Sequence, residues 1–213
     1  MQTLELLERH PTAWRGATRH PFLDAVREGT LPPRALEAWL TQDYLFVADL
    51  LVFQAQLLVR APRPHQAVLA GGLVALEAEL GWFEEKARER GLELEASRHP
   101  TTVAYRDFLI GLGYEPYAAG MTALWALERA YLDAWKSVAP GLPGYREFVE
   151  HWTTSEFADY VAGLEKAAGS ALESGGQGER ERAEIAFLEV ARLEKDFWEI
   201  ASLATRQSPR GNR

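Results

Sequence analysis

Four acidic residues occupy positions of predicted helices where the apolar pattern predicts a hydrophobic side chain. They are Asp43, Glu79, Glu128 and Glu194, one in each of four helices. An ionised carboxylate is costly to bury unless it is paired or hydrogen-bonded, and a single such acid is most often a structural group. Four acids from separate helices favour a shared site that binds a metal, binds an amino-bearing ligand or transfers protons.

The residue three positions after each acid helps to distinguish these three functions, because side chains at positions i and i+3 share one face of a helix. Di-iron bundles place His there, in Glu-x-x-His pairs. In this chain the four positions hold Phe46, Trp82, Tyr131 and Phe197, and the five His residues lie near predicted helix ends or loops. We therefore predict no metal site and no other cofactor.

The acid-x-x-aromatic spacing favours a pocket for a small, flat, nitrogen-rich ligand. Aromatic rings offer a slot in which a heterocycle can stack, and carboxylates accept hydrogen bonds from its amino group or ring N–H. Ordinary core packing is the alternative explanation for most of these aromatic residues.

Proline and glycine residues divide the chain into the helices that must position these groups. After a short opening helix comes a segment over residues 11–28, and we predict helices over 33–59, 65–90, 101–111, 117–138, 145–172 and 179–205. Strand signals are nearly absent. The pattern predicts an all-α protein, with a single helical-bundle domain over residues 1–206 and a polar, disordered tail over 207–213.

The composition argues against several classes of function. The 213 residues carry a net charge of −8 without a basic stripe, which argues against binding to nucleic acid or to an anionic membrane surface. The absence of Cys excludes disulfides, thiolate metal sites and a Cys nucleophile. We find neither a signal peptide nor an apolar stretch of about 18 residues that could span a bilayer, and therefore expect a cytoplasmic protein.

Short motifs occur in a distinctive order along residues 20–201. They are His20-Pro21-Phe22, Gly29-Thr30-Leu31, Gln42-Asp43-Tyr44, Tyr105, Trp125-Ala126-Leu127-Glu128 with Tyr131, Trp152 with Glu156-Phe157, and Glu194 with Phe197-Trp198-Glu199. This series resembles the TenA (thiaminase II) family, the aminopyrimidine hydrolases of thiamin salvage. The resemblance implies a heme-oxygenase-like helical fold, a small aminopyrimidine ligand, and assembly as a homodimer or homotetramer.

The resemblance also implies roles for individual residues. Asp43 resembles the acid that holds the aminopyrimidine, and Glu194 resembles the catalytic glutamate. Tyr105 matches a pocket tyrosine that hydrogen-bonds near the reacting centre, whereas Trp152 and Phe46 stand where many members have tyrosine. The expected substrate-binding residues are Asp43, Phe46, Glu79, Tyr105, Trp152 and Phe197.

The missing Cys separates this chain from the better-studied branch of the family, whose Cys nucleophile lies in the helix that here contains residues 123–128. The chain is more similar to a Cys-less branch, which is linked to removal of a formyl group from a formylaminomethyl-pyrimidine. We therefore predict a C–N hydrolase in which water is the nucleophile and Glu194 acts as general base and then as acid. Glu128 is a second candidate catalytic acid unless it pairs with Arg129, and Tyr131 and Tyr105 could stabilise an oxyanion.

Three other functions stay open on the sequence alone. A non-catalytic pyrimidine-binding or regulatory protein would keep the aromatic slot and Asp43 but would not need Glu194. A metal-dependent oxygenase on the same fold would carry iron or manganese. A tetrapyrrole-binding protein would need a proximal His on an early helix, for which His20 is the one candidate. The sequence also leaves open whether thiamin itself is a substrate.

Overall fold

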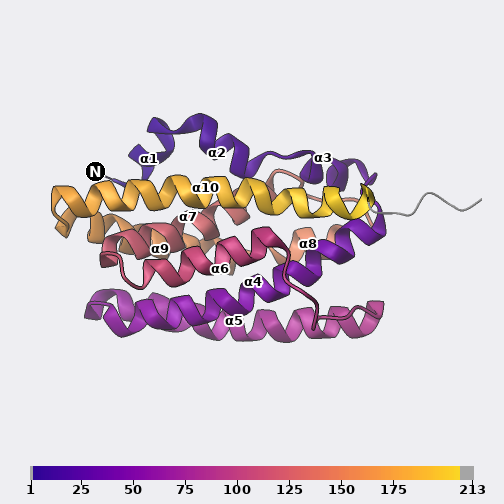
Figure 1. Ribbon diagram of the computed structural model, residues 1–213, viewed down its shortest axis with the longest axis horizontal. Coiled ribbons are helices and arrows are strands. Elements are labelled where there is room, and N and C mark those ends of the chain that lie inside the picture. The colour runs from indigo at the N-terminus through magenta and orange to yellow at the C-terminus, as the bar shows by residue number, and fades with distance from the viewer. Residues whose placement is uncertain (1, 207–213) are drawn as a thin grey trace, which may run out of the picture.

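Ten helices form the regular structure of the described part of the chain (Figure 1). The computed structural model describes the backbone of residues 2–206 and the side chains of residues 2–201, so the predicted tail over 207–213 lies outside the described residues. The helices are α1 (Thr3–Arg9), α2 (Pro11–Thr18), α3 (Pro21–Glu28), α4 (Pro33–Arg60), α5 (Arg63–Arg90), α6 (Pro100–Leu112), α7 (Tyr117–Lys136), α8 (Arg146–His151), α9 (Ser155–Ser174) and α10 (Gln177–Arg206). Within this described part no strand occurs, and the predicted all-α class is confirmed.

Five predicted helices agree with α4, α5, α6, α7 and α10 to within two residues at each end. The segment over 11–28 is divided into α2 and α3. Pro21 opens α3, where a missing N–H costs nothing, and the ring of His20 caps this helix by accepting from Phe22 N at 3.1 Å.

The single helix predicted over 145–172 is wrong, because the structure has α8 and α9 in its place. α8 ends at His151, and the Thr154 hydroxyl caps α9 by accepting from Phe157 N at 3.1 Å. A Thr at this position replaces a helical hydrogen bond with a side-chain one and so favours a new helix start. The break leaves Trp152 at a turn and not on a helix face.

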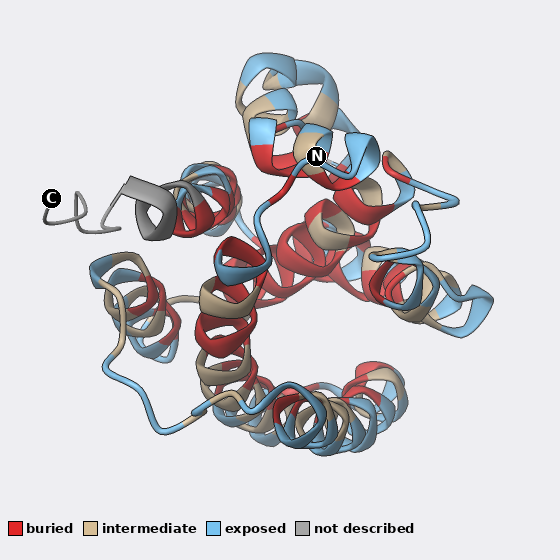
Figure 2. Ribbon diagram, turned by 90° about the vertical axis from the view of Figure 1, so that its right-hand side faces the viewer, coloured by how far each residue is buried: buried red, intermediate tan, exposed pale blue. Residues whose placement is uncertain are grey.

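α7 is the central helix of the bundle and is buried on nearly every face. It packs against α10 and α9, while α4 packs against α5 and α10. α1 to α3 lie along the outer side of α10 in Figure 1, and α2 contacts both α10 and α7. In Figure 2 the buried parts of the helices (red) face the interior and the exposed parts (pale blue) face outward. An acid on α7 is therefore carried into the interior.

Among the described helices, α4 alone has the length and mean hydropathy of a membrane-spanning segment. Its surroundings explain its apolar content in another way. It packs against α5, α6 and α10, and it keeps Gln42, Asp43 and Gln54 buried. This is the pattern of a core helix, and it brings Asp43 into the middle of the bundle.

Candidate functional site

A cavity of about 380 Å³ lies between α4, α5, α7 and α9, beside the turn that follows α8. This volume is in the range of small-molecule sites. The residues that line it are Asp43, Phe46, Val47, Leu50, Gly72, Ala75, Leu76, Ala78, Glu79, Leu127, Glu128, Tyr131, His151, Trp152, Thr154, Glu156, Phe157 and Tyr160. Six of the residues predicted for the site are in this set, whereas Tyr105, Glu194 and Phe197 are not.

Asp43, which is buried, and Tyr131, which is partly buried, form a hydrogen-bonded pair on the wall. The Tyr131 hydroxyl donates to Asp43 Oδ2 at 2.8 Å. Burial raises the pKa of Asp43 well above its usual value, the Tyr131 hydrogen bond opposes this, and nearby carboxyl groups raise it further. Asp43 therefore favours its neutral form, which can donate one hydrogen bond and accept another.

Glu79 holds the turn between α8 and α9. Its Oε1 accepts from Trp152 Nε1 at 2.7 Å, and its Oε2 lies 2.6 Å from His151 Nε2. The His151 ring stacks on Trp82, with 4.0 Å between ring centroids and 6° between planes. The prediction that Glu79 is buried is wrong, because its side chain keeps 20% of its surface exposed. It lies at the edge of the cavity, where it fixes Trp152 in the wall.

Glu128 is buried on the wall and has no hydrogen-bond partner among residues 2–201. Arg129 does not pair with it, since that guanidinium binds Asp133 at 3.0 Å and Glu165 at 3.1 Å. Burial raises the pKa of Glu128 from 4.5 to about 8, and neighbouring carboxyl groups contribute to the increase. At neutral pH this carboxyl therefore carries a proton that it can donate into the cavity.

Glu194 lies behind the wall and is paired. Tyr105 donates its hydroxyl to Glu194 Oε1 at 2.6 Å, and both residues are buried. The wall residue in contact with this layer is Phe46, whose ring centroid lies 4.6 Å from that of Tyr105 and 5.5 Å from that of Phe197. Burial raises the pKa of Glu194 from 4.5 to about 7, against the opposing effect of the Tyr105 hydrogen bond. The three predicted residues that do not line the cavity thus form one layer next to Phe46.

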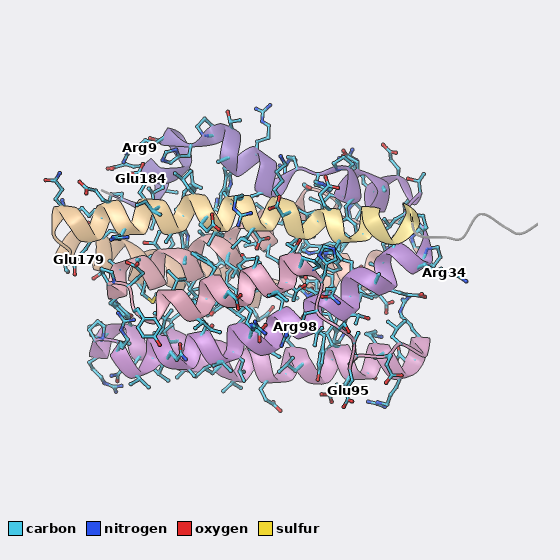
Figure 3. All side chains as sticks on the ribbon, viewed as in Figure 1. Arg9, Arg34, Glu95, Arg98, Glu179 and Glu184 are labelled. Carbon is cyan, nitrogen blue, oxygen red and sulfur yellow. The ribbon has the colours of Figure 1, made fainter. Side chains whose placement is uncertain are left out.

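The position of Tyr105 depends on how the start of α6 is attached to α4. Gln42 Nε2 donates to the backbone carbonyl of Ser97, in the loop before α6, at 3.1 Å. Gln42 Oε1 accepts from His99 N and from the hydroxyl of Thr102, on the first turn of α6, both at 2.7 Å. Arg98, labelled over α4 in Figure 3, forms an ion pair with Asp49 of that helix at 2.9 Å. The residue beside Asp43 in the sequence therefore helps to place the tyrosine that binds Glu194.

Comparison with known proteins identifies the family of this bundle. The profile of the TENA/THI-4/PQQC family matches residues 7–204. The chain belongs to this family. The solved structure of a TenA homologue from Pyrococcus furiosus is 36% identical, and the match covers 94% of this chain and 100% of that one with a TM-score of 0.90. The fold is the heme-oxygenase-like helical bundle.

Two curated relatives also align with most of the chain. The "Probable bifunctional TENA-E protein" of Glycine max is 29% identical over an alignment of 210 positions that covers 92% of this chain and 90% of that protein. The "Aminopyrimidine aminohydrolase" of Halalkalibacterium halodurans is 24% identical over an alignment of 213 positions that covers 92% of this chain and 93% of that protein. The likeness therefore extends along nearly the full length of each chain.

A metal-dependent oxygenase and a tetrapyrrole-binding protein would both need metal-ligating side chains, and the described part of the chain does not place suitable ones together. Over residues 2–201 no three His, Asp or Glu side chains gather closely enough to hold a metal ion. His20 uses both ring nitrogens, since Nδ1 accepts from Phe22 N and Nε2 lies 3.0 Å from Glu199 Oε1. His20 is thus a helix cap, with no nitrogen left for a tetrapyrrole iron.

The sequence reasoning missed several wall residues, among them His151 and Tyr160. Tyr160 donates to Gln54 Oε1 at 2.9 Å, and Gln54 donates to the backbone carbonyl of Leu69 at 2.8 Å. Gly72 makes room for this pair, because a Cβ at that position would collide with both Gln54 Nε2 and the Tyr160 hydroxyl. A glycine inside a predicted helix lowers helix stability, so Gly72 was the signal in the sequence that other side chains approach the helix closely at this point.

Proposed function

We propose that this protein is a hydrolase of thiamin salvage that cleaves the C–N bond of an aminomethyl-pyrimidine derivative, the N-formyl form being its simplest substrate. The observation that carries the proposal is a proton-bearing carboxyl, Glu128, on the same cavity wall as the hydrogen-bonded Asp43–Tyr131 pair. The name of the Halalkalibacterium halodurans relative, an aminopyrimidine aminohydrolase, supports the choice of substrate class.

Asp43 is proposed to hold the pyrimidine ring. A neutral carboxyl can donate to a ring nitrogen while its other oxygen accepts from the adjacent amino group, which matches the amidine-like edge of a 4-aminopyrimidine. The Tyr131 hydroxyl already fixes one oxygen of Asp43, and the Trp152 and Phe46 rings supply aromatic wall beside it. Among the described residues that line the cavity none is Lys or Arg, which supports an unphosphorylated ligand.

The proposed reaction needs one group that accepts a proton and one that donates a proton. Water adds to the formyl carbon while Glu194 takes its proton, and the tetrahedral intermediate then loses the amine while Glu128 protonates the leaving nitrogen. The C–O bond forms, the C–N bond breaks, and the products are formate and the aminomethyl-pyrimidine. Two carboxyls with pKa values near 7 and near 8 suit these opposite tasks at neutral pH.

Glu194 is assigned as the base through the family resemblance, and its assignment carries a structural requirement. Since it lies in the layer behind Phe46, its carboxylate must come within hydrogen-bond reach of the attacking water when substrate is bound. Tyr131 is proposed to orient Asp43 on the wall, because its one hydroxyl proton is already donated to that carboxyl. We also propose that the protein acts in the cytoplasm as a homodimer or homotetramer, without nucleic acid or membrane, which sedimentation and cell fractionation would test.

The direct test is incubation of the purified protein with thiamin, the aminomethyl-pyrimidine and its N-formyl form, followed by mass spectrometry. We expect formate release from the N-formyl compound. The Glu194→Gln variant should bind this compound normally in calorimetry and release nothing. Tight binding without any product from the wild-type protein would support the non-catalytic pyrimidine-binding function instead, and unchanged turnover by Glu194→Gln would contradict the role of that residue.

A further inference from the structure

The cavity continues beyond the groups that the proposed reaction uses. Leu50 follows Asp43 by two turns on α4, and Gly72 precedes Glu79 by two turns on α5. α4 and α5 are antiparallel neighbours joined by a short connection, so both walls run about 10 Å in the same direction at 1.5 Å per residue. A pyrimidine ring held by Asp43 fills only part of that length.

The far part of the cavity, here called the apolar arm, is lined by Val47, Leu50, Gly72, Leu76, Phe157 and Tyr160. Glu128 lies between the arm and the part of the cavity beside Asp43. It is three residues before Tyr131 on α7, and it lies near enough to Tyr160 to contribute, after burial, to the raised pKa of that hydroxyl. A substrate whose ring contacts Asp43 and whose reacting nitrogen reaches Glu128 therefore directs the substituent on that nitrogen into the arm.

The polar side chains at the end of the arm are hydrogen-bonded to each other and to the backbone. The Tyr160 hydroxyl donates to Gln54 Oε1, and Gln54 Nε2 donates to Leu69 O. A charged acidic substituent placed here would lose its water without meeting a Lys or Arg among the described residues that line the cavity. An apolar substituent would gain contact with aliphatic and aromatic walls at no such cost.

We propose that the apolar arm binds an apolar N-acyl group, so that the preferred substrates of this site are aminomethyl-pyrimidines carrying acyl chains longer than formyl. This inference rests on the proposed hydrolase function and extends its substrate class. The reaction is unchanged: water supplies OH to the acyl carbon, the C–N bond breaks, and the amine takes the proton. Each methylene buried in the arm improves kcat/KM by about fourfold.

The test is a series of N-acyl aminomethyl-pyrimidines with formyl, acetyl, propionyl and butyryl groups, and succinyl as a charged chain of similar length to butyryl. We expect kcat/KM to rise from formyl to butyryl, and the succinyl compound to fall below butyryl by at least about tenfold. Cleavage of the formyl compound with falling kcat/KM along the series would overturn the arm while leaving the hydrolase function intact. Equal rates for succinyl and butyryl would also overturn it.

Two glycines on α5 provide a matched pair of variants. Gly72→Ala introduces a methyl that must displace Tyr160 or Gln54, whereas a Cβ at Gly71 meets no atom within 4 Å. Gly72→Ala should lower the butyryl-to-formyl ratio of kcat/KM by about tenfold, and Gly71→Ala should leave that ratio unchanged. Equal ratios in the two variants would contradict the proposal. Leu76→Phe, which narrows the arm from another wall position, replaces Gly72→Ala if that variant does not fold.

Binding measurements separate a failure of the arm from a failure of the hydrolase function. If no compound of the series is cleaved, calorimetric Kd values for the same compounds still report on the arm. Affinity that rises with chain length in the wild-type protein and not in Gly72→Ala supports the arm in a binding protein. Affinity that does not depend on chain length overturns it.

Discussion

Glu128 on α7 and Glu194 on α10 are both buried acids, yet their surroundings differ. Glu128 lines the cavity and has no hydrogen-bond partner among residues 2–201. Glu194 lies one layer behind Phe46 and accepts a hydrogen bond from Tyr105. Burial raises the pKa of both acids; the Tyr105 hydrogen bond opposes this increase for Glu194, to about 7, and the charges of Glu79 and Glu194 add to it for Glu128, to about 8. The difference teaches that a hydrogen bond to one acid and negative charges beside the other can suit two similar buried acids to opposite proton-transfer tasks.

The largest expected effect comes from removing the proton donor on the wall. Glu128→Gln keeps the size of the side chain but cannot donate a proton to the leaving amine, so kcat should fall by about 10²–10⁴-fold with little change in Kd. Turnover by mass spectrometry and binding by calorimetry, both with the N-formyl compound, would measure this. Glu77→Gln, on the exposed side of α5 and outside the cavity, is the matched control. A loss of kcat no larger than that of the control would contradict the role of Glu128.

A smaller effect is expected from the partner of the second acid. Tyr105→Phe removes the hydrogen bond that lowers the pKa of Glu194, so this pKa should rise. The acidic limb of the kcat/KM profile then moves to higher pH, and activity on that limb falls by about tenfold for every pH unit that the limb moves. Tyr145→Phe removes a comparable hydrogen bond of 2.6 Å to Leu31 O, outside the cavity lining, and should leave the limb in place. The same limb position in both variants would show that Tyr105 only supports the fold.

The smallest effect concerns stability. The folded protein keeps the proton of Glu128 up to a pKa of about 8, whereas the unfolded chain releases it near 4.5, so this group makes the wild-type protein less stable as pH rises between these values. Glu128→Gln removes this loss, and the dependence of unfolding free energy on pH should become less steep by up to about 1.4 kcal/mol per pH unit in that window. Denaturant unfolding from pH 5 to 8 measures the slope. Parallel curves for the two proteins would mean that Glu128 is not held neutral by burial.

The sequence predicted most of the fold and part of the site. Helical periodicity correctly predicted burial for Asp43, Glu128 and Glu194, because a residue within an apolar stripe of a core helix follows its neighbours into the interior. It was wrong for Glu79, whose helix lies at the edge of the bundle, where the same stripe faces a cavity and solvent. Periodicity reports the face of a helix and cannot report what covers that face.

Other features depend on side-chain contacts between distant segments and could not be read from one helix at a time. The pairing of Tyr105 with Glu194 joins α6 to α10, and the placement of that pair behind Phe46 follows from packing alone. The break before α9 depends on Thr154 taking over a helical hydrogen bond, which local propensity does not require. The ordered motifs nevertheless marked Trp152 as a site residue, and in the structure Trp152 lines the cavity.

The central claim is that Glu194 accepts a proton from water and Glu128 donates a proton to the leaving amine. The most direct test is to measure how kcat/KM for the N-formyl compound depends on pH in the wild-type protein and in Glu128→Gln. We predict a bell-shaped profile for the wild-type protein, rising through a pKa near 7 and falling through a pKa near 8. In Glu128→Gln the residual activity should rise through the lower pKa and stay level above pH 8. A descending limb near pH 8 that persists in Glu128→Gln would contradict this assignment.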